Sequence, residues 1–354
     1  MLKKKMSKNT RSNLITYGIV IVAFIVMQTL ISTGSISSLM EGLMIPLCIY
    51  IILAVSLNLV VGILGELSLG HAGFMCAGAF ASAFFSKCMR DVITIAPLRF
   101  FLALLIGVAV AAVFGIIIGI PVLRLKGDYL AIVTLAFGEI IKNLVNVLFI
   151  GKDSNGFHFS TKDVMDLNME ADGTVIVNGP QGITGTPQDS TFVIGVILIL
   201  ITLFIVINMV NSRDGRAIMA IRDNRIAAES VGINVTKYKL MAFTVSAALA
   251  GAAGVLYAHN LSTLTANTNN FGYNMSINIL VFVVLGGIGS IRGSMIAAVV
   301  LTLLPELLRG LSDYRMLIYA IVLIIMMLFN WSPKAIEWRE KYLSFGKKKK
   351  EAVK

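Results

Sequence analysis

The stretch "LGELSLGHAGFMCAGAF", residues 64–80, places a carboxylate, an imidazole and several glycines inside a chain that is otherwise strongly apolar. Hydrophobic residues make up 57% of the 354 residues, charged residues only 14%, and the mean hydropathy is +0.85. Soluble domains rarely have such a composition, so the sequence predicts an integral membrane protein. Glycines and polar groups within one span further predict a membrane helix that is interrupted.

Apolar windows recur along the chain, each able to cross about 30 Å of hydrocarbon as a helix of roughly 20 residues. Because a membrane span must satisfy its own backbone hydrogen bonds, we expect an all-α, polytopic bundle of about ten spans. Residues 1–340 would form one transmembrane domain with broken, glycine-rich helices, and residues 341–354 a basic tail. The windows are residues 14–31, 43–61, 67–85, 100–123, 129–150, 192–210, 240–258, 275–288, 294–308 and 316–329.

The basic residues predict the orientation of these spans. The run Lys3–Lys5 precedes a first apolar segment that is longer than a signal-peptide core, so we expect a retained span. If both termini are cytoplasmic, most of the 30 basic residues lie in cytoplasmic segments, as the positive-inside rule requires. The net charge of +11 then needs no nucleic acid. It reflects topology and a lysine tail that is either simply solvated or in contact with anionic membrane lipid.

Two hydrophilic segments interrupt the apolar chain. Residues 151–190 are acidic and external in this topology, and are expected to be either a passive connector or a loop that meets a soluble partner or covers the entrance. Residues 211–239 are cytoplasmic. There, Asp223 or Asn224 can cap a short helix, "RIAAESV", and Gly232 can close it in a left-handed conformation. Its alanine pair, Ala227 and Ala228, predicts a smooth docking surface, although an ordinary connecting loop is the alternative.

The sequence lacks the motifs of several catalytic classes. No G-x-x-x-x-G-K-[ST] phosphate-binding loop occurs, and neither a nucleophile–base arrangement nor a metal motif is found, so an enzyme is not expected. The three cysteines and three histidines are too scattered for a disulfide framework or a metal site. The chain is therefore expected to bind no cofactor.

The glycine-rich break predicts a transport pathway, because irregular backbone in a membrane is tolerated where it lines protein or a watery cavity. A second break, "LGGIGSIRG", is a candidate counterpart in a duplicated architecture. Tight helix packing is the alternative explanation for these glycines. The candidate pathway residues are Gly65, Glu66, Ser68, Gly70, His71 and Gly73 in the first break and Gly286, Gly287 and Gly289 in the second.

Charged residues within the other spans are spaced as pairs. Glu139 and Lys142, like Glu306 and Arg309, lie three residues apart and would share a helix face. We expect both to be structural ion pairs in preference to a proton relay.

Several longer stretches carry a family resemblance: "GELSLGHAGFMCAGAFASA", "LKGDYLAIVTLAFGEIIKNL", "NGPQGITGTP", "GRAIMAIRDNRIAAESVGINVTKYKLMAFTVSAALAGAAGVLYA" and "VLGGIGSIRGSMIAA". The chain resembles the permeases of bacterial ABC importers for branched-chain amino acids, specifically the larger of the two permease types. The resemblance implies a multi-pass protein of the bacterial inner membrane. It also implies three kinds of partner, namely ATPase subunits that use the ATP, a second similar permease and an external solute-binding protein.

The resemblance also implies a cytoplasmic Glu-Ala-Ala…Gly helix that seats in the ATPase. Ala227, Ala228 and Gly232 match it and Arg222 lies beside it, but Ile226 replaces the glutamate and the nearest acid is Glu229. The acidic external segment is longer than usual in the family, and the end "FNWSPKAIEW" also departs from the family pattern.

Two classes of function stay open at this point. The first is an ABC importer permease for branched-chain amino acids, or for urea and short amides, sugars or nucleosides. The second is a stand-alone, ion-coupled secondary transporter or a channel, for which unpaired intramembrane acids and no docking helix would be expected.

Overall fold

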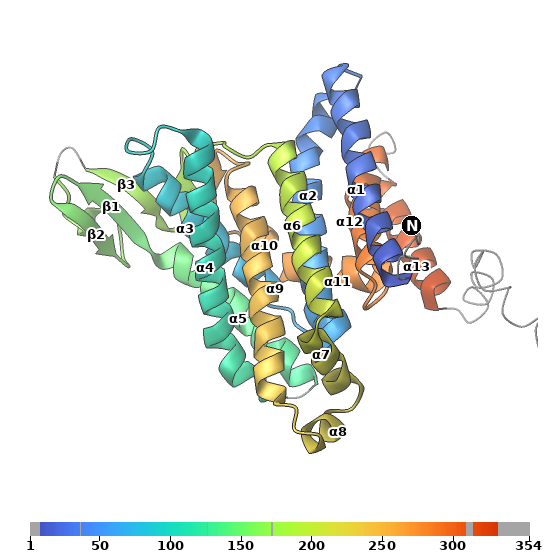
Figure 1. Ribbon diagram of the computed structural model, residues 1–354. Helices are drawn as coiled ribbons and strands as arrows, with labels where there is room; N and C mark the ends of the chain where they lie inside the picture. Colours follow the sequence, from blue (N-terminus) through green and yellow to red (C-terminus); the bar gives the residue numbers. More distant parts are fainter. Residues whose placement is uncertain (1–7, 36, 126, 171–172, 309–313, 332–354) are drawn as a thin grey trace, which may run out of the picture.

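The structure, a computed structural model, describes residues 8–35, 37–125, 127–170, 173–308 and 314–331, and it is mostly helical (Figure 1). Short helices α7 (Arg213–Asp223), α8 (Arg225–Ser230) and α10 (Thr268–Phe271) connect longer ones. The tail at 341–354 lies outside the described residues. The long helices are α1 (Lys8–Ser32), α2 (Ser38–Asn58), α3 (His71–Cys88), α4 (Ala96–Val122), α5 (Asp128–Val147), α6 (Phe192–Asn211), α9 (Val235–Ala258), α11 (Tyr273–Gly286), α12 (Ile291–Leu307) and α13 (Arg315–Trp331).

Six helical segments in the described part of the chain are long and apolar enough to cross a membrane, which makes this a multi-pass membrane protein. The four other predicted windows also fall on helices, α3, α11, α12 and α13, but these are shorter or less apolar. The number of about ten spans therefore stays a prediction, as does the cytoplasmic placement of the termini. The six segments are Asn13–Ser32, Ser38–Leu64, Ala96–Val122, Asp128–Val147, Phe192–Asn211 and Val235–Ala258.

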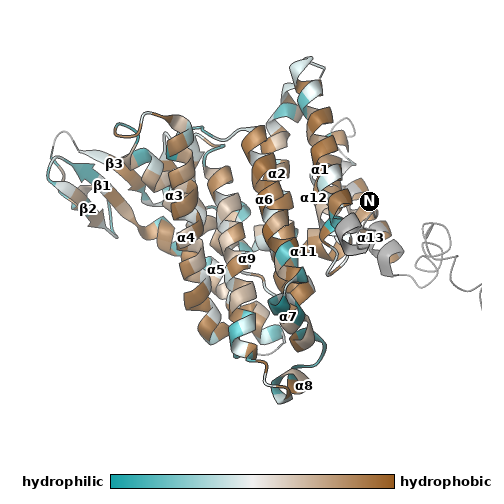
Figure 2. Cartoon of the chain, viewed as in Figure 1, coloured by the Kyte–Doolittle hydropathy of each residue, from teal (hydrophilic) through white to brown (hydrophobic). Residues whose placement is uncertain are grey.

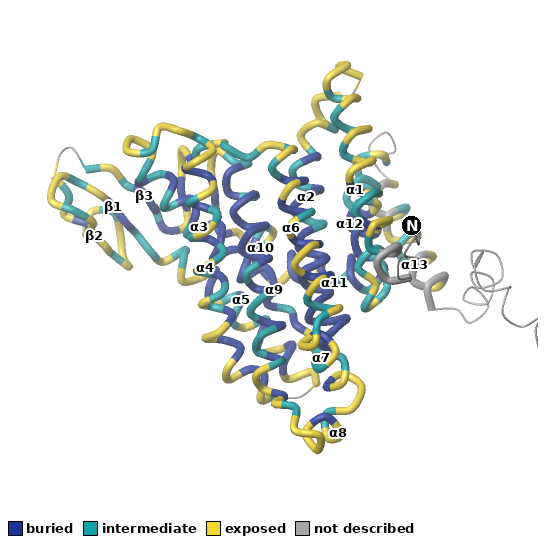
Figure 3. Tube along the Cα trace, in the orientation of Figure 1, coloured by how far each residue is buried: buried dark blue, intermediate teal, exposed yellow. Residues whose placement is uncertain are grey.

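Helices α2, α3 and α9 form the buried centre of the bundle, whereas α1, α4 and α6 carry exposed apolar side chains on the outside (Figures 2 and 3). Small residues let the central helices approach closely. A Cβ atom on Gly78 of α3 would lie 2.6 Å from the Cα atom of Gly251 of α9. Such backbone proximity is typical of membrane helices, whose association depends on packing because the lipid is as apolar as the side chains.

The acidic segment is not a loop. It contributes strands β1 (Phe149–Asp153), β2 (Gly156–Ser160) and β3 (Thr174–Asn178), which form an antiparallel sheet in the order β2-β1-β3. Strand β4 (Ile183–Thr184) pairs with β5 (Thr263–Leu264) after α9 and ties the segment to the bundle. We call residues 149–184 the β insert. The prediction of an all-helical fold is therefore wrong here, and a connector at 151–190 is replaced by a folded element.

Helices α7 and α8 form a helical hairpin at the lower end of the molecule in Figure 1, apart from the β insert, and α8 follows its predicted capping. The side-chain oxygen of Asn224 accepts a hydrogen bond from the backbone N–H of Ala227 at 3.1 Å, which caps α8. Gly232 closes the turn with φ +84°, a conformation that side chains disfavour. The short helix predicted from "RIAAESV" is thus confirmed.

Candidate functional site

The first break lies between α2 and α3. Helix α2 continues as a π-helix, Leu59–Leu64, and the chain is then non-helical until α3 begins at His71. Gly65 has φ +79°, and a Cβ atom there would lie 2.5 Å from Cγ of Arg222. π-Helical turns are rare in proteins, and those that occur are often at functional positions. This segment is therefore the first candidate for movement.

The second break, between α11 and α12, touches the first. A Cβ atom on Gly62 would lie 2.6 Å from the Cα atom of Gly289. The side-chain amide of Asn58 joins the two breaks, because its oxygen accepts from the N–H of Gly289 at 2.9 Å while its nitrogen donates to Oγ of Ser294 at 3.0 Å. Gly287 and Gly289 have φ of +94° and +82°. Sequence reasoning missed Asn58, although an isolated amide in an apolar helix is a recognisable signal.

The predicted pathway side chains are buried in the interior. His71 is buried, and its Nε2 lies 2.7 Å from Oγ of Ser56 in a hydrogen bond. Ser68 is also buried, and its hydroxyl has no hydrogen-bond partner within the described residues. Oγ1 of Thr134 accepts from the N–H of Leu69 at 3.0 Å, and thereby fixes the non-helical segment to α5.

The glycines at the start of α3 pack against α5. A Cβ atom on Gly73 would lie 2.6 Å from the Cα atom of Gly138, and one on Gly70 would collide with the carbonyl oxygen of Thr134. Gly286 is equally close to Gly293 across the second break. The geometry at these positions is that of close packing, and their role in a pathway stays a prediction.

Charged side chains gather where the first break faces α7 and α9. The carboxylate of Glu66 is paired with the ammonium of Lys239, whose side chain is only 5% exposed. Arg222 donates from Nη1 to the carbonyl oxygen of Gly62 at 3.0 Å. A cavity of about 460 Å³ opens beside them and is also lined by Leu64 and Ile221. Sequence reasoning missed Lys239, which is recognisable as the last charged residue before the apolar stretch of α9.

Two ion pairs hold the half of the bundle nearer the β insert. Nζ of Lys142 lies 2.5 Å from Oε2 of Glu139, and Oε1 of the same carboxylate accepts from the N–H of Tyr273 at 2.8 Å, which links α5 to α11. Arg99 and Asp189 form a second, buried pair at 2.7 Å that the sequence did not predict. Arg309, the predicted partner of Glu306, lies outside the described residues, so that pairing stays a prediction.

The two alanines of α8 face different ways. Ala227 is exposed, whereas Ala228 is 3% exposed and packs with Ile221 and Val235, on α7 and α9. The expectation that both alanines form one smooth docking surface is therefore wrong for Ala228. Its small side chain instead lets α8 lie close to its neighbours in the same chain.

Two large aliphatic side chains are exposed at the tip of this hairpin, among polar neighbours. Ile226 is 80% exposed and Val231 is 75% exposed. Both lie outside the six membrane-spanning segments, so lipid does not account for their exposure. Exposed apolar side chains gathered at one tip are typical of a contact surface. Sequence reasoning treated Ile226 only as a departure from a pattern, yet it is among the most exposed apolar residues of the described chain.

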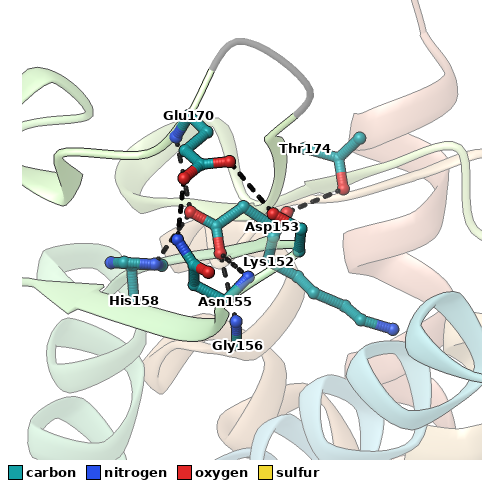
Figure 4. A network of polar contacts seen from close by, with 8 residues as sticks. Lys152, Asp153, Asn155, Gly156, His158, Glu170 and Thr174 are labelled. Carbon is teal, nitrogen blue, oxygen red and sulfur yellow. Dashed lines mark hydrogen bonds and ion pairs between the residues drawn. The ribbon is translucent and has the colours of Figure 1, made fainter.

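A polar network organises the β insert (Figure 4). The carboxylate of Asp153 accepts hydrogen bonds from the N–H groups of Asn155 at 2.8 Å, Gly156 at 3.1 Å and Glu170 at 3.3 Å, and lies 2.9 Å from Nε2 of His158. Desolvation of this carboxylate acts to raise its pKa, but the hydrogen bonds and His158 outweigh it, so the pKa of Asp153 lies below its usual value. The network joins the β1–β2 turn to the segment before β3.

Asp153→Ala is expected to loosen the β insert, because four polar groups lose their shared acceptor. Since the pKa of Asp153 is lowered by folding, its stabilisation is present above the unfolded value of about 3.9 and is lost as the pH falls through the folded value. Limited proteolysis at neutral pH should therefore cut the variant within 153–174 and spare the wild type. Equal protection of both proteins would show that the network does not order the insert.

A family model and two similar proteins agree on one family. The family model described as "Branched-chain amino acid transport system / permease component" matches residues 39–329. The high-affinity branched-chain amino acid transport system permease protein LivM is 36% identical in Escherichia coli (strain K12), over 298 residues, and 35% identical in Salmonella typhimurium, over 297 residues. Each alignment covers 81% of this chain and 67% of the relative.

A more distant relative is named for the import of a different substrate. The ribose import permease protein RbsC of Escherichia coli (strain K12) is 28% identical over 292 residues, which cover 79% of this chain and 81% of the relative. No solved structure matches this chain.

Proposed function

The chain belongs to the family of permease components of branched-chain amino acid transport systems, and from this premise we propose how its parts serve such a system. The resemblance found in the sequence is confirmed, and the protein is an ABC permease for branched-chain amino acids. Identity to the LivM proteins exceeds identity to the ribose permease, so a sugar is not the favoured substrate. A permease is a transport component, and ATP would be bound and used by a separate chain.

The hairpin α7–α8 is the proposed docking element for that ATPase. The observation that carries this assignment is the exposure of Ile226 and Val231 at a tip that follows a span and is rich in basic residues. Basic residues favour the cytoplasmic side, where an ATPase has access to ATP. With this orientation, Arg222, Ala227, Ala228 and Gly232 belong to the coupling segment, and Ala228 acts by holding α8 to α7 and α9.

The β insert then lies on the outer side of what would be the bacterial inner membrane. Its edge strand β2 exposes Phe157 and Phe159, and η2 (Met165–Leu167) exposes Met165. A folded, partly apolar element at the external end suits contact with an external solute-binding protein that delivers the amino acid. A second, similar permease would complete the pathway, as is usual for assemblies built from related subunits.

Purification of the tagged chain from its native membrane in mild detergent tests this set of partners. We expect the ATPase and the second permease to co-purify in stoichiometric amounts, and the ATPase to be lost when the permease hairpin is blocked by an antibody fragment against residues 222–232. Purification of this chain alone, together with concentrative uptake that needs no ATP in liposomes, would instead assign it to the stand-alone transporters.

A further inference from the structure

The contacts of Lys239 indicate a role for a residue that the sequence did not single out. Its side chain is buried, lies in the second turn of α9 and forms an ion pair with Glu66 of the first break. A buried charge is expensive unless it is paired, so each partner strongly restricts where the other can lie. The pair therefore fixes the position of the non-helical segment relative to α9.

Arg222 makes a second connection to the same break. Its guanidinium donates to the carbonyl oxygen of Gly62 in the π-helix, and its aliphatic stem covers Gly65. Gly65 has a positive φ and no side chain, which leaves room for that stem. The π-helix and the segment after it are thus held from α7 as well as from α9.

Both connections start beside α8, which we call the coupling helix. Ile221, Ala228 and Val235, from α7, α8 and α9 respectively, form one small hydrophobic cluster. Arg222 directly follows Ile221, and Lys239 lies one helical turn after Val235. A displacement of α8 would therefore move both side chains that hold the break.

We propose that Lys239, through Glu66, is a positioning residue that links movement of the coupling helix to opening of the first break, with Arg222 as the second link. The proposal rests on the proposed function of α8 as the ATPase docking element. It predicts that these contacts set how many ATP molecules are hydrolysed for each amino acid transported, and not merely how fast transport runs. Without them, the ATPase would still bind and hydrolyse ATP, but its movement would no longer reach the pathway.

The test uses the whole complex in proteoliposomes and measures ATP hydrolysis and leucine uptake together. The double variant Glu66→Gln/Lys239→Met removes both charges, so it leaves no unpaired buried charge to prevent folding. We expect it to retain the ATPase on purification, and the ratio of ATP hydrolysed to leucine transported to rise about tenfold, a typical size for coupling between two sites. Lys239→Arg, which keeps the charge, should stay close to the wild-type ratio.

A matched control is the variant Arg99→Met/Asp189→Asn, which neutralises another buried ion pair at 2.7 Å. Asp189 precedes α6 and α7 follows it, so this pair lies at the end of α6 away from α7 and α8. The ratio of this variant should not change. A wild-type ratio in the Glu66→Gln/Lys239→Met variant would overturn the proposal. If that variant does not accumulate, Arg222→Gln decides the matter, because Arg222 is partly exposed and its loss should be tolerated. An unchanged ratio there would also overturn the proposal.

Failure of the inference and failure of the proposed function give different results. If the proposed function is wrong, the wild-type complex shows no ATP-dependent leucine uptake at all. If only the inference is wrong, the wild type transports leucine and the variants transport it at the same ATP cost.

Discussion

The double variant Ile226→Asp/Val231→Asp is expected to reach the membrane at wild-type abundance and to purify without its ATPase. Both side chains are exposed in the isolated chain, so their replacement leaves the interior of the permease unchanged. Burial of two aliphatic side chains in an interface contributes about 3 to 6 kcal/mol. Loss of that contribution corresponds to at least about 100-fold weaker binding, and unpaired carboxylates in the interface would weaken it further.

Co-purification of the ATPase with the tagged permease measures this effect. Met165→Asp is the matched control, since Met165 is 86% exposed but belongs to η2 of the β insert and not to the α7–α8 hairpin. Ala228→Glu is a useful contrast. Position 228 is buried, so a carboxylate there should disturb the packing of α7, α8 and α9 and lower permease abundance as well. An ATPase that stays bound to the double variant would show that this tip is an ordinary connector.

Gly73→Leu is expected to prevent accumulation of a folded permease. The new side chain would meet the backbone of Gly138, and backbone cannot move aside as a flexible side chain can. Overpacking of this kind typically costs about 1 to 3 kcal/mol, and contact with backbone places the change at the upper end or beyond. The expected result is low membrane abundance, measured by immunoblot, and correspondingly low uptake.

Gly42→Leu is the control for this prediction, because a Cβ atom on Gly42 of α2 has nothing within 4 Å. That variant should accumulate normally and transport normally. If Gly73→Leu instead accumulates at the wild-type level and fails only in uptake, Gly73 lines the pathway and its close contact with α5 is not needed for folding.

The sequence predicts the membrane-helical part of this fold well because hydrophobic length is a direct physical requirement of a span. It also locates both breaks, because in each of them glycines cluster with polar residues inside an otherwise apolar window. It cannot show that the breaks touch. The hydrogen bond between Asn58 and Gly289 joins residues separated by 231 positions, and neither residue alone specifies its partner.

The β insert was missed for a different reason. Its strands are five residues or fewer, and they are separated by glycine, asparagine and aspartate, which are typical of loops. Two contacts that hold the segment join residues distant in sequence, namely the hydrogen bond from Glu170 to Asp153 and the pairing of β4 with β5.

The orientation of α8 also lies beyond a sequence pattern. Adjacent residues on a helix point about 100° apart, so an alanine pair cannot lie wholly on one face, and six residues give no periodicity to locate the buried side. The structure resolves this by placing Ala228 against Ile221 and leaving Ala227 exposed. It also reveals the contact of Lys239, whose partner Glu66 lies 173 residues away in the sequence.

Uptake by proteoliposomes tests the central claim most directly. This chain, the second permease and the ATPase are reconstituted together, ATP is enclosed on the ATPase side, and the binding protein is added outside with labelled leucine. The account predicts accumulation of leucine against its gradient that needs ATP, the binding protein and this chain, with ribose failing to compete. Leucine accumulation by this chain alone without ATP, or uptake of ribose in place of leucine by the full complex, would contradict the account.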